Sequence, residues 1–175
     1  MSGIFMDSET PIGLVRVVEQ DGAITRVDLS SCQGFAARAC GRAGTSALLR
    51  SALQQLHEYF AGTRTAFDLP LRPAGTAFQR QAWQALCAIP YGETRSYAQQ
   101  ARAVGRPTAT RAIGAANGRN PIAIVVPCHR VIGSDGSLTG YAGGEAVKRW
   151  LLQHEGAQKR PQLDLWSAAS TATAT

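Results

Sequence analysis

The stretch that most strongly indicates the fold is Ser96-Tyr-Ala-Gln-Gln-Ala-Arg-Ala-Val-Gly-Arg-Pro-Thr-Ala-Thr-Arg-Ala-Ile-Gly-Ala-Ala-Asn-Gly118. Ser96 can cap a helix over residues 97–104, and Gly105-Arg-Pro107 then predicts a tight turn. Thr108 opens a second helix that reaches residue 118. Two short helices joined by a turn that contains glycine predict a helix-turn-helix, although many such helical hairpins bind nothing.

The second helix of this pair has an unusually smooth surface around Arg111. Its other side chains are small: Ala109, Ala112, Gly114, Ala115 and Ala116. A reader of the major groove needs long polar side chains that reach base edges. A smooth helix that carries one arginine instead favours close approach to the minor groove with little sequence readout. The alternative is that the alanines pack inside the domain.

Positive charge is concentrated around the predicted helix-turn-helix. The net charge is +6, and residues 94–134 contain no Asp or Glu. The arginines of this stretch are Arg95, Arg102, Arg106, Arg111, Arg119 and Arg130. Such a stretch focuses positive potential and suits a polyanion. On charge alone, a solvated face balanced by acids elsewhere in space is also possible.

The segments outside this region predict a sheet first and helices later. The expected elements are strands at 12–18, 23–29 and 66–69, a hairpin turn at 20–22, a loop at 34–44, and helices at 46–60, 76–88 and 146–154. The apolar face of the helix at 76–88 contains Phe78, Ala82, Trp83, Leu86 and Cys87. We therefore predict an α+β fold, with a small antiparallel sheet and one helix (residues 1–72) packed on a mainly helical domain (residues 73–158). Residues 159–175 show no periodicity and predict a flexible tail.

Composition excludes several classes of protein. No apolar run approaches the roughly 18 residues that span a bilayer, and the N-terminus lacks the pattern of a secretory signal. We therefore expect a cytoplasmic protein with no membrane partner. The four cysteines form no Cys-x-x-Cys pair, and the three histidines complete no recognisable zinc set. We expect free thiols and no metal.

One cysteine lies where its chemistry can matter. The apolar run at residues 122–126 leads into Pro127-Cys-His-Arg-Val-Ile132. The thiolate is the nucleophilic form of cysteine, and positive neighbours lower the pKa of a thiol. We therefore expect His129 and Arg130 to lower the pKa of Cys128, with Glu155 available to orient the histidine. By itself, an adjacent Cys-His pair is more often structural than catalytic.

The pattern around Cys128 strongly resembles the O6-alkylguanine-DNA alkyltransferase family. The matching motifs are Thr10-Pro-Ile-Gly13, Gly75-Thr-x-Phe-x4-Trp-x2-Leu86, Ile89-Pro-x-Gly-Glu-Thr-x-Ser-Tyr97, Arg111-Ala-Ile-Gly114, Asn120-Pro-x4-Val-Pro-Cys-His-Arg-Val-Ile132, Thr139-Gly-Tyr-Ala-Gly-Gly144 and Lys148-x2-Leu-Leu-x2-Glu155. The resemblance covers residues of about 8 to 156, and the motif around the cysteine is highly specific.

The resemblance implies direct-reversal DNA repair, in which Cys128 takes a methyl or other alkyl group from O6 of guanine. The family enters the minor groove of double-stranded DNA with the second helix of its helix-turn-helix and flips the damaged nucleotide out of the stack. By this pattern the candidate residues for DNA and substrate binding are Arg111, Tyr97, Val131, Tyr141, Ala142 and Gly143. Ala142 departs from relatives that have serine there, which puts pocket shape and alkyl size in question.

The resemblance also implies the roles of the catalytic residues. Cys128 attacks the alkyl carbon, while His129, held by Glu155, draws off the thiol proton through a water molecule. The other candidate catalytic residues are Tyr97, Lys148 and Asn120. The thioether product is inert, so the implied reaction is a single turnover without a cofactor. The implied protein is a monomer that can bind DNA cooperatively.

Two alternatives differ from this reading in their chemistry. A non-catalytic alkyltransferase-like or helix-turn-helix protein would bind DNA but lack the nucleophile, whereas this chain has Cys128, His129 and Glu155. A cysteine hydrolase would need an oxyanion hole, and its histidine would lie far from the cysteine in sequence. Only the alkyltransferase would become covalently labelled by DNA that carries labelled O6-methylguanine.

Overall fold

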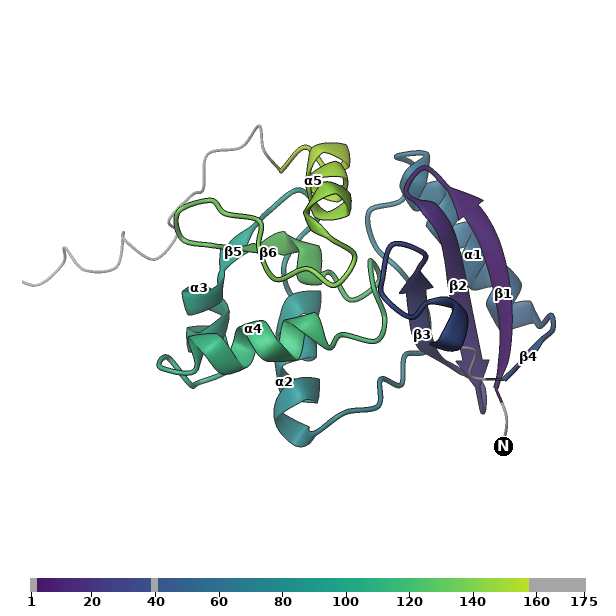
Figure 1. The fold of residues 1–175 in the computed structure, drawn as a ribbon, viewed down its shortest axis with the longest axis horizontal. Helices are drawn as coiled ribbons and strands as arrows, with labels where there is room; N and C mark the ends of the chain where they lie inside the picture. Colours follow the sequence, from purple (N-terminus) through teal and green to yellow (C-terminus); the bar gives the residue numbers. More distant parts are fainter. Residues whose placement is uncertain (1–2, 39–40, 158–175) are drawn as a thin grey trace, which may run out of the picture.

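Two structural parts lie side by side in the computed structural model, which describes residues 3–38 and 41–157 (Figure 1). One part is a sheet covered by a helix, and the other is mainly helical, as predicted. The elements in chain order are β1 (Ile4–Thr10), β2 (Gly13–Gln20), β3 (Ala23–Leu29), a 3-10 helix (Ala36–Arg38), β4 (Arg42–Ala43), α1 (Ala47–Phe60), α2 (Ala77–Cys87), β5 (Arg95–Ser96), α3 (Tyr97–Ala103), α4 (Thr110–Gly118), a 3-10 helix (Cys128–Arg130), β6 (Val131–Ile132) and α5 (Glu145–His154).

The sheet has the strand order β3-β2-β1-β4. The predicted hairpin joins β2 to β3 through Asp21 and Gly22, which both have positive φ angles, 49° and 74°. This conformation matches the twist of the flanking strands. The sequence patterns had not indicated β1, which pairs with β2 in antiparallel orientation. Within the segment predicted as a loop, β4 adds a short parallel pairing to β1, so the sheet is mixed.

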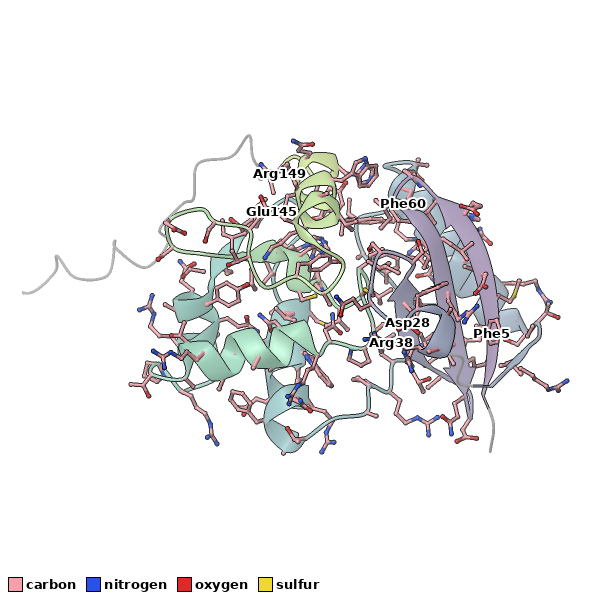
Figure 2. All side chains as sticks on the ribbon, in the orientation of Figure 1. Phe5, Asp28, Arg38, Phe60, Glu145 and Arg149 are labelled. Carbon is pink, nitrogen blue, oxygen red and sulfur yellow. The ribbon has the colours of Figure 1, made fainter. Side chains whose placement is uncertain are left out.

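Helix α1 covers the sheet with the apolar face that its spacing predicts. Leu49, Leu53 and Leu56 are buried, and Ser46 caps the helix by accepting a hydrogen bond from the backbone N–H of Leu49. Phe60, at the end of α1, points toward α5 (Figure 2). Its ring lies 5.8 Å from that of Trp150, so the helix also contacts the second part of the molecule.

The prediction of a strand at residues 66–69 is wrong. The side-chain amide of Gln55 takes the place of a neighbouring strand there: it accepts from the N–H of Asp68 at 2.8 Å and donates to the carbonyl of Asp68 at 3.0 Å. Sheet-like pairing begins only later, where Leu71 forms an isolated parallel bridge with Ile24. A side chain from α1 therefore satisfies backbone groups that the sequence pattern assigned to a sheet.

The helical part begins with two well-capped helices. Thr76 with Gln79, and Ser96 with Gln99, form reciprocal capping boxes at the starts of α2 and α3. Cys87 was predicted to face inward but is exposed, because α2 turns the face of Ala82, Trp83 and Leu86 to the core. These three are the buried residues of the helix.

The second helix of the predicted helix-turn-helix starts later than expected. Thr108 does not open it; α4 begins at Thr110 after Ala109, which provides no side-chain cap. Gly105 has a φ of 70° in the turn between α3 and α4, where glycine avoids the strain of a side chain. Ala112 and Ala115 are exposed on α4, whereas Ala116 is buried. The small side chains of α4 therefore lie partly on the surface of the protein and partly in its core.

A buried pair of amides joins the two helices of the helix-turn-helix. Gln100 donates to Asn117 at 3.0 Å, and Asn117 donates back to Gln100 at 2.7 Å. The Gln100 amide also donates to the carbonyl of Ala82 on α2. Both amide side chains are almost completely buried, at 3% and 4% exposure. Their pairing therefore fixes α3 against α4 without leaving either amide unsatisfied.

The sheet and the helical part share one hydrophobic core. Val27 of β3 donates to the carbonyl of Pro121 and accepts from the N–H of Ala123, which extends the edge of the sheet into the segment before Cys128. The core cluster contains residues of both parts, including Val17 and Leu151. Cys128 belongs to the same cluster, so the thiol lies at the junction of the two parts.

Two expectations concern the chain as a whole. In the part of the chain that the structure describes, no helix is long and apolar enough to cross a membrane. The predicted tail at residues 159–175 lies outside the described residues.

Removing one partner of the buried amide pair should destabilise the fold. In Gln100→Ala, Asn117 remains buried with unsatisfied groups, which costs about 1–3 kcal/mol. At roughly 2–4 °C per kcal/mol for a chain of this size, a clear drop in the melting temperature follows. Thermal unfolding should show that the double variant Gln100→Ala/Asn117→Ala loses less than the sum of the single losses. Gln84→Ala, at an exposed position of α2, is the control, and strictly additive losses would contradict the coupling.

Candidate active site

Two successive tight turns present Cys128. The N–H of Val125 donates to the carbonyl of Ala123 at 2.8 Å, which places Ile124 at a φ of 70°. A β-branched residue in this left-handed region is strained by about 1–3 kcal/mol, and the buried Ile124 side chain in the core holds it there. The N–H of Cys128 then donates to the carbonyl of Val126 at 2.9 Å. The backbone therefore makes a sharp reversal just before the thiol.

Asn120 ties this turn together. Its side-chain N–H donates to the carbonyl of Val126 at 2.8 Å and to the Cys128 Sγ at 3.2 Å, and its oxygen accepts from the N–H of Ile122 at 3.0 Å. Asn120 follows α4 by two residues, so the amide joins the end of the helix-turn-helix to the thiol.

Cys128 lies at the wall of a cleft of about 800 Å³ between the two structural parts. The thiol residue is 8% exposed. The helical part contributes Asn120, Tyr141, Ala142 and Gly143 to the lining, and all four are candidate site residues from the sequence. The sheet contributes Val27, Asp28, Leu29 and Cys32, which the sequence patterns did not indicate. These residues follow β3 to its end, a position that only the packing of the two parts reveals.

Gly143 lies where no side chain would fit. A Cβ atom there would meet the Tyr141 ring at 2.8 Å and Leu29 at 3.1 Å. The loop therefore packs tightly against β3 at this wall of the cleft. The Tyr141 hydroxyl is buried with no hydrogen-bond partner in the described part of the chain, and burial raises the pKa of this phenol well above its usual value. Tyr141 therefore offers a neutral hydroxyl beside the thiol.

The expectation that His129 and Arg130 lower the pKa of Cys128 is wrong. Burial raises the pKa of the thiol, while the Asn120 hydrogen bond and the charge of Lys148 oppose this rise without overcoming it. Arg130 instead points its guanidinium at Glu155 and the carbonyl of Ile89. Cys128 is therefore a protonated thiol at neutral pH and needs a base to become a nucleophile.

His129 follows Cys128 directly and has a free acceptor nitrogen. Its Nε2 lies 2.7 Å from Glu155 Oε1, and because an ionised carboxylate only accepts, Nε2 carries the proton. Nδ1 is then a bare acceptor, and it is buried with no hydrogen-bond partner among the described residues. Burial lowers the pKa of His129, and the hydrogen bond and charge of Glu155 oppose this only in part. His129 is therefore neutral; within the described residues, no direct hydrogen bond joins it to Cys128.

Glu155 collects hydrogen bonds from several directions. It accepts five, which come from the Tyr59 hydroxyl, His129 Nε2, two nitrogens of Arg130 and the N–H of Gly92. Burial alone would raise the pKa of Glu155, but the hydrogen bonds from His129 and Arg130, together with the charge of Arg130, outweigh it and hold the pKa far below its usual value. The carboxylate is thus ionised and paired with Arg130. The sequence patterns did not indicate Tyr59, and they included Gly92 in a motif without assigning it this contact.

Tyr97 and Lys148 meet on the other side of the thiol. The Tyr97 hydroxyl donates to the carbonyl of Thr139 at 2.9 Å. Lys148 Nζ donates to the carbonyls of Val131 at 2.5 Å and Thr139 at 3.3 Å, and it lies 5.8 Å from the centre of the Tyr97 ring. Burial lowers the pKa of Lys148 to about 8. None of Tyr97, Lys148 and Val131 lines the cleft; they support the loop that does.

The arginines of the acid-free stretch separate into two groups. Arg130 is buried in its ion pair with Glu155, and Arg95 pairs with Glu93, so neither adds a free charge to the surface. The exposed members are Arg102, Arg106, Arg111 and Arg119. Arg111 lies on the exposed face of α4 and outside the cleft lining. The positive surface is therefore real but smaller than the sequence implied.

Metal ligands do not cluster within the described residues, where no group of three or more His, Cys, Asp and Glu side chains could hold an ion. Cys32, Cys87 and Cys128 are free thiols. Cys40 lies outside the described residues.

Together, the fold and the site define a helix-turn-helix protein with a buried cysteine beside a cleft. The family model for the 6-O-methylguanine DNA methyltransferase ribonuclease-like domain matches residues 5–73, and that for the DNA binding domain of the same family matches residues 77–157. The chain therefore belongs to the 6-O-methylguanine DNA methyltransferase family.

Individual relatives agree with this assignment. A methylated-DNA--protein-cysteine methyltransferase of Methanosarcina barkeri is 46% identical over 147 residues, which cover 84% of this chain and 93% of the relative. The constitutive one of Bacillus subtilis is 48% identical over 155 residues, 86% of this chain and 94% of the relative. The crystal structure of Mycobacterium tuberculosis OGT in complex with DNA has a TM-score of 0.82 and 44% identity, covering 89% of this chain and 94% of that one.

The neutral, buried state of His129 predicts how stability depends on pH. An unfolded histidine takes up a proton below a pH of about 6.5, whereas folded His129 does so only at lower pH. The contribution of neutral His129 to the free energy of unfolding is therefore complete above a pH of about 6.5. It is lost as the pH falls further, by at most about 1.4 kcal/mol per pH unit. Urea unfolding at about pH 7.5 and about pH 5.5 should show a smaller loss for His129→Gln than for the native chain. His57→Gln, at an exposed ring, is the control, and equal losses in all three proteins would contradict the argument.

Proposed function

We propose that this protein repairs DNA by transferring a methyl or other alkyl group from O6 of guanine to Cys128. The observation that carries the proposal is the buried thiol at the cleft wall, held by Asn120 and next to the neutral base His129. The names of the relatives support the same chemistry. We further propose that residues 1–72 and 73–158 are the two domains that enclose the cleft.

The reaction begins with proton removal from the thiol. His129 Nδ1 accepts the Cys128 proton through a bridging water molecule, and Glu155 stabilises the imidazolium that forms. The thiolate Sγ then attacks the alkyl carbon in line, so that an S–C bond forms while the C–O6 bond breaks. The electron pair of that bond leaves with guanine. Asn120 and Lys148 stabilise the thiolate because they favour its charged form.

The leaving guanine needs a proton. Tyr97 and Lys148 share the carbonyl of Thr139, so a shift in this loop brings their protons toward the departing base. The pKa of Lys148, lowered by burial to about 8, makes its ammonium a better acid than an ordinary lysine. The thioether at Cys128 does not hydrolyse, and each molecule therefore reacts once.

Double-stranded DNA approaches from the side of α4. The exposed alanines of this helix allow close contact with the minor groove, and Arg111 projects into the duplex to fill the gap left by the flipped nucleotide. The backbone of Val131 and the residues Tyr141, Ala142 and Gly143 hold the base. The exposed arginines contact phosphates, which gives affinity without sequence preference. The monomer can bind DNA cooperatively.

A non-catalytic DNA-binding protein is less consistent with this site. Such a protein has no use for a thiol at a cleft wall that is followed in the chain by a neutral histidine hydrogen-bonded to an ionised glutamate. A hydrolase is disfavoured because the exposed arginines suit a polyanion.

Loss of the nucleophile should abolish the chemistry but not the binding. Cys128→Ala should take no label from DNA carrying labelled O6-methylguanine, while its affinity for duplex DNA stays within about twofold because phosphate contacts dominate binding. Intact-mass spectrometry and a gel-shift assay measure the two properties. Cys87→Ala, at the exposed thiol, is the control and should label like the native chain. Label on Cys128→Ala itself would refute the assignment.

Loss of Arg111 should affect the duplex more than the free base. Arg111→Ala should slow repair in duplex DNA at least about tenfold and leave the reaction with free O6-methylguanine nearly unchanged, since only the duplex requires base extrusion. Single-turnover rate constants on both substrates test this. Arg102→Ala, at another exposed arginine, controls for general loss of positive charge. Equal slowing on both substrates would place Arg111 in pocket chemistry or folding instead.

A further inference from the structure

We infer that Tyr59, which lies on α1 in the sheet part of the molecule, is a positioning residue for the Glu155–His129 pair. Its hydroxyl donates to Glu155 Oε1 at 2.7 Å, and the same oxygen accepts from His129 Nε2 at 2.7 Å. The two donors lie far apart in the chain and belong to different structural parts. This inference rests on the proposed function, because it concerns the base in that reaction.

The hydroxyl of Tyr59 can act only as a donor here. The side chain is fully buried, and burial followed by the charge of Glu155 raises the pKa of the phenol far above its usual value. A carboxylate oxygen that accepts from a neutral hydroxyl has less electron density to offer its other partner. Tyr59 therefore limits how strongly Glu155 attracts the proton of His129.

Aromatic packing fixes the direction of this hydroxyl. The Tyr59 ring makes edge contacts with Tyr91 and His154, with centres 6.0 Å and 5.2 Å apart, and a tilted contact with Phe67 at 5.5 Å. Rings packed on several sides leave the hydroxyl one orientation, toward Glu155. The sheet part therefore holds the catalytic carboxylate in place through a rigid side chain.

Three charged groups, Glu155, Lys148 and Arg130, act directly on His129. Glu155 and Lys148 face it from α5 and Arg130 from the 3-10 helix, and both cations disfavour its protonation. Glu155 is the group that favours it. A change in the basicity of Glu155 therefore transfers directly to His129. Without the Tyr59 hydroxyl, Glu155 attracts the proton more strongly, and the pKa of His129 rises.

A higher pKa impairs the base at neutral pH. His129 must be neutral to accept the thiol proton, so a rise in its pKa shortens the pH range in which it works. A single hydrogen bond of ordinary strength corresponds to a shift of about half to one pH unit. The rate of alkyl transfer should fall through loss of orientation as well as through this shift.

Tyr59→Phe tests the inference because it removes one oxygen and keeps the packed ring. The rate constant of alkyl transfer near pH 7 should fall about five- to tenfold, and the acid limb of the pH–rate profile should move up by about half to one pH unit. Tyr91→Phe is the matched control. It removes a hydroxyl from a ring of the same cluster, where the oxygen donates to the carbonyl of His154 at 3.4 Å. Its rate and pH profile should equal those of the native chain.

A second measurement is independent of activity. NMR titration of the His129 ring in Tyr59→Phe should show a higher pKa than in the native chain and in Tyr91→Phe. If native protein takes no label from O6-methylguanine DNA, the proposed function fails, yet this titration still decides whether Tyr59 acts on His129. An unchanged His129 titration and an unchanged pH profile, with only a lower melting temperature, would show a purely structural role and overturn the inference.

Discussion

A single buried carboxylate holds the active site to the rest of the molecule. Glu155 accepts hydrogen bonds from Tyr59 on α1, Gly92 before β5, and His129 and Arg130 after the cysteine. An isolated charge at this depth would cost several kcal/mol, so these partners are required for the helix that carries Glu155 to pack where it does. The same bonds orient the imidazole. The contacts that hold the two parts together at Glu155 therefore also hold His129 in place.

Cys128 differs from Glu155 in its protonation state, because its surroundings keep the thiol protonated, whereas those of Glu155 keep the carboxylate ionised. Burial raises the pKa of Cys128, and the strained turn at Ile124 presents it with only the Asn120 amide bonded to the sulfur. Asn120 and Lys148 favour the thiolate, but they act against the larger effect of burial. Activation therefore depends on proton removal at the moment of reaction. Positive charge from His129 and Arg130, which the sequence had suggested, would instead have raised the thiolate fraction before the reaction.

Local patterns allowed much of the fold to be predicted, and long-range contacts explain the rest. Helix α1 and the capping boxes at Thr76 and Ser96 follow from nearest-neighbour chemistry that a sequence displays directly. Of the residues marked by the motifs, Asn120, Cys128, Tyr141, Ala142 and Gly143 line the cleft, whereas His129 and Glu155 are buried behind it. No local pattern shows that Gln55 replaces a strand partner for residues 66–69. The Tyr59–Glu155 bond, between residues 96 positions apart, is invisible for the same reason.

The pairing of Arg130 with Glu155 also explains how the acid-free stretch, residues 94–134, can have arginines both on the surface and in the interior. Its buried arginine is neutralised by an acid from beyond residue 134, so no acid within the stretch is needed. The arginines that remain exposed keep their full positive potential for a polyanion. Near the thiol, the interior contains the neutral His129, the Arg130–Glu155 ion pair and the buried Lys148, whose charge favours the thiolate. Attraction of a polyanion thus depends on the exposed arginines, whereas activation of the thiol depends on buried groups, and burial keeps Cys128 protonated before it reacts.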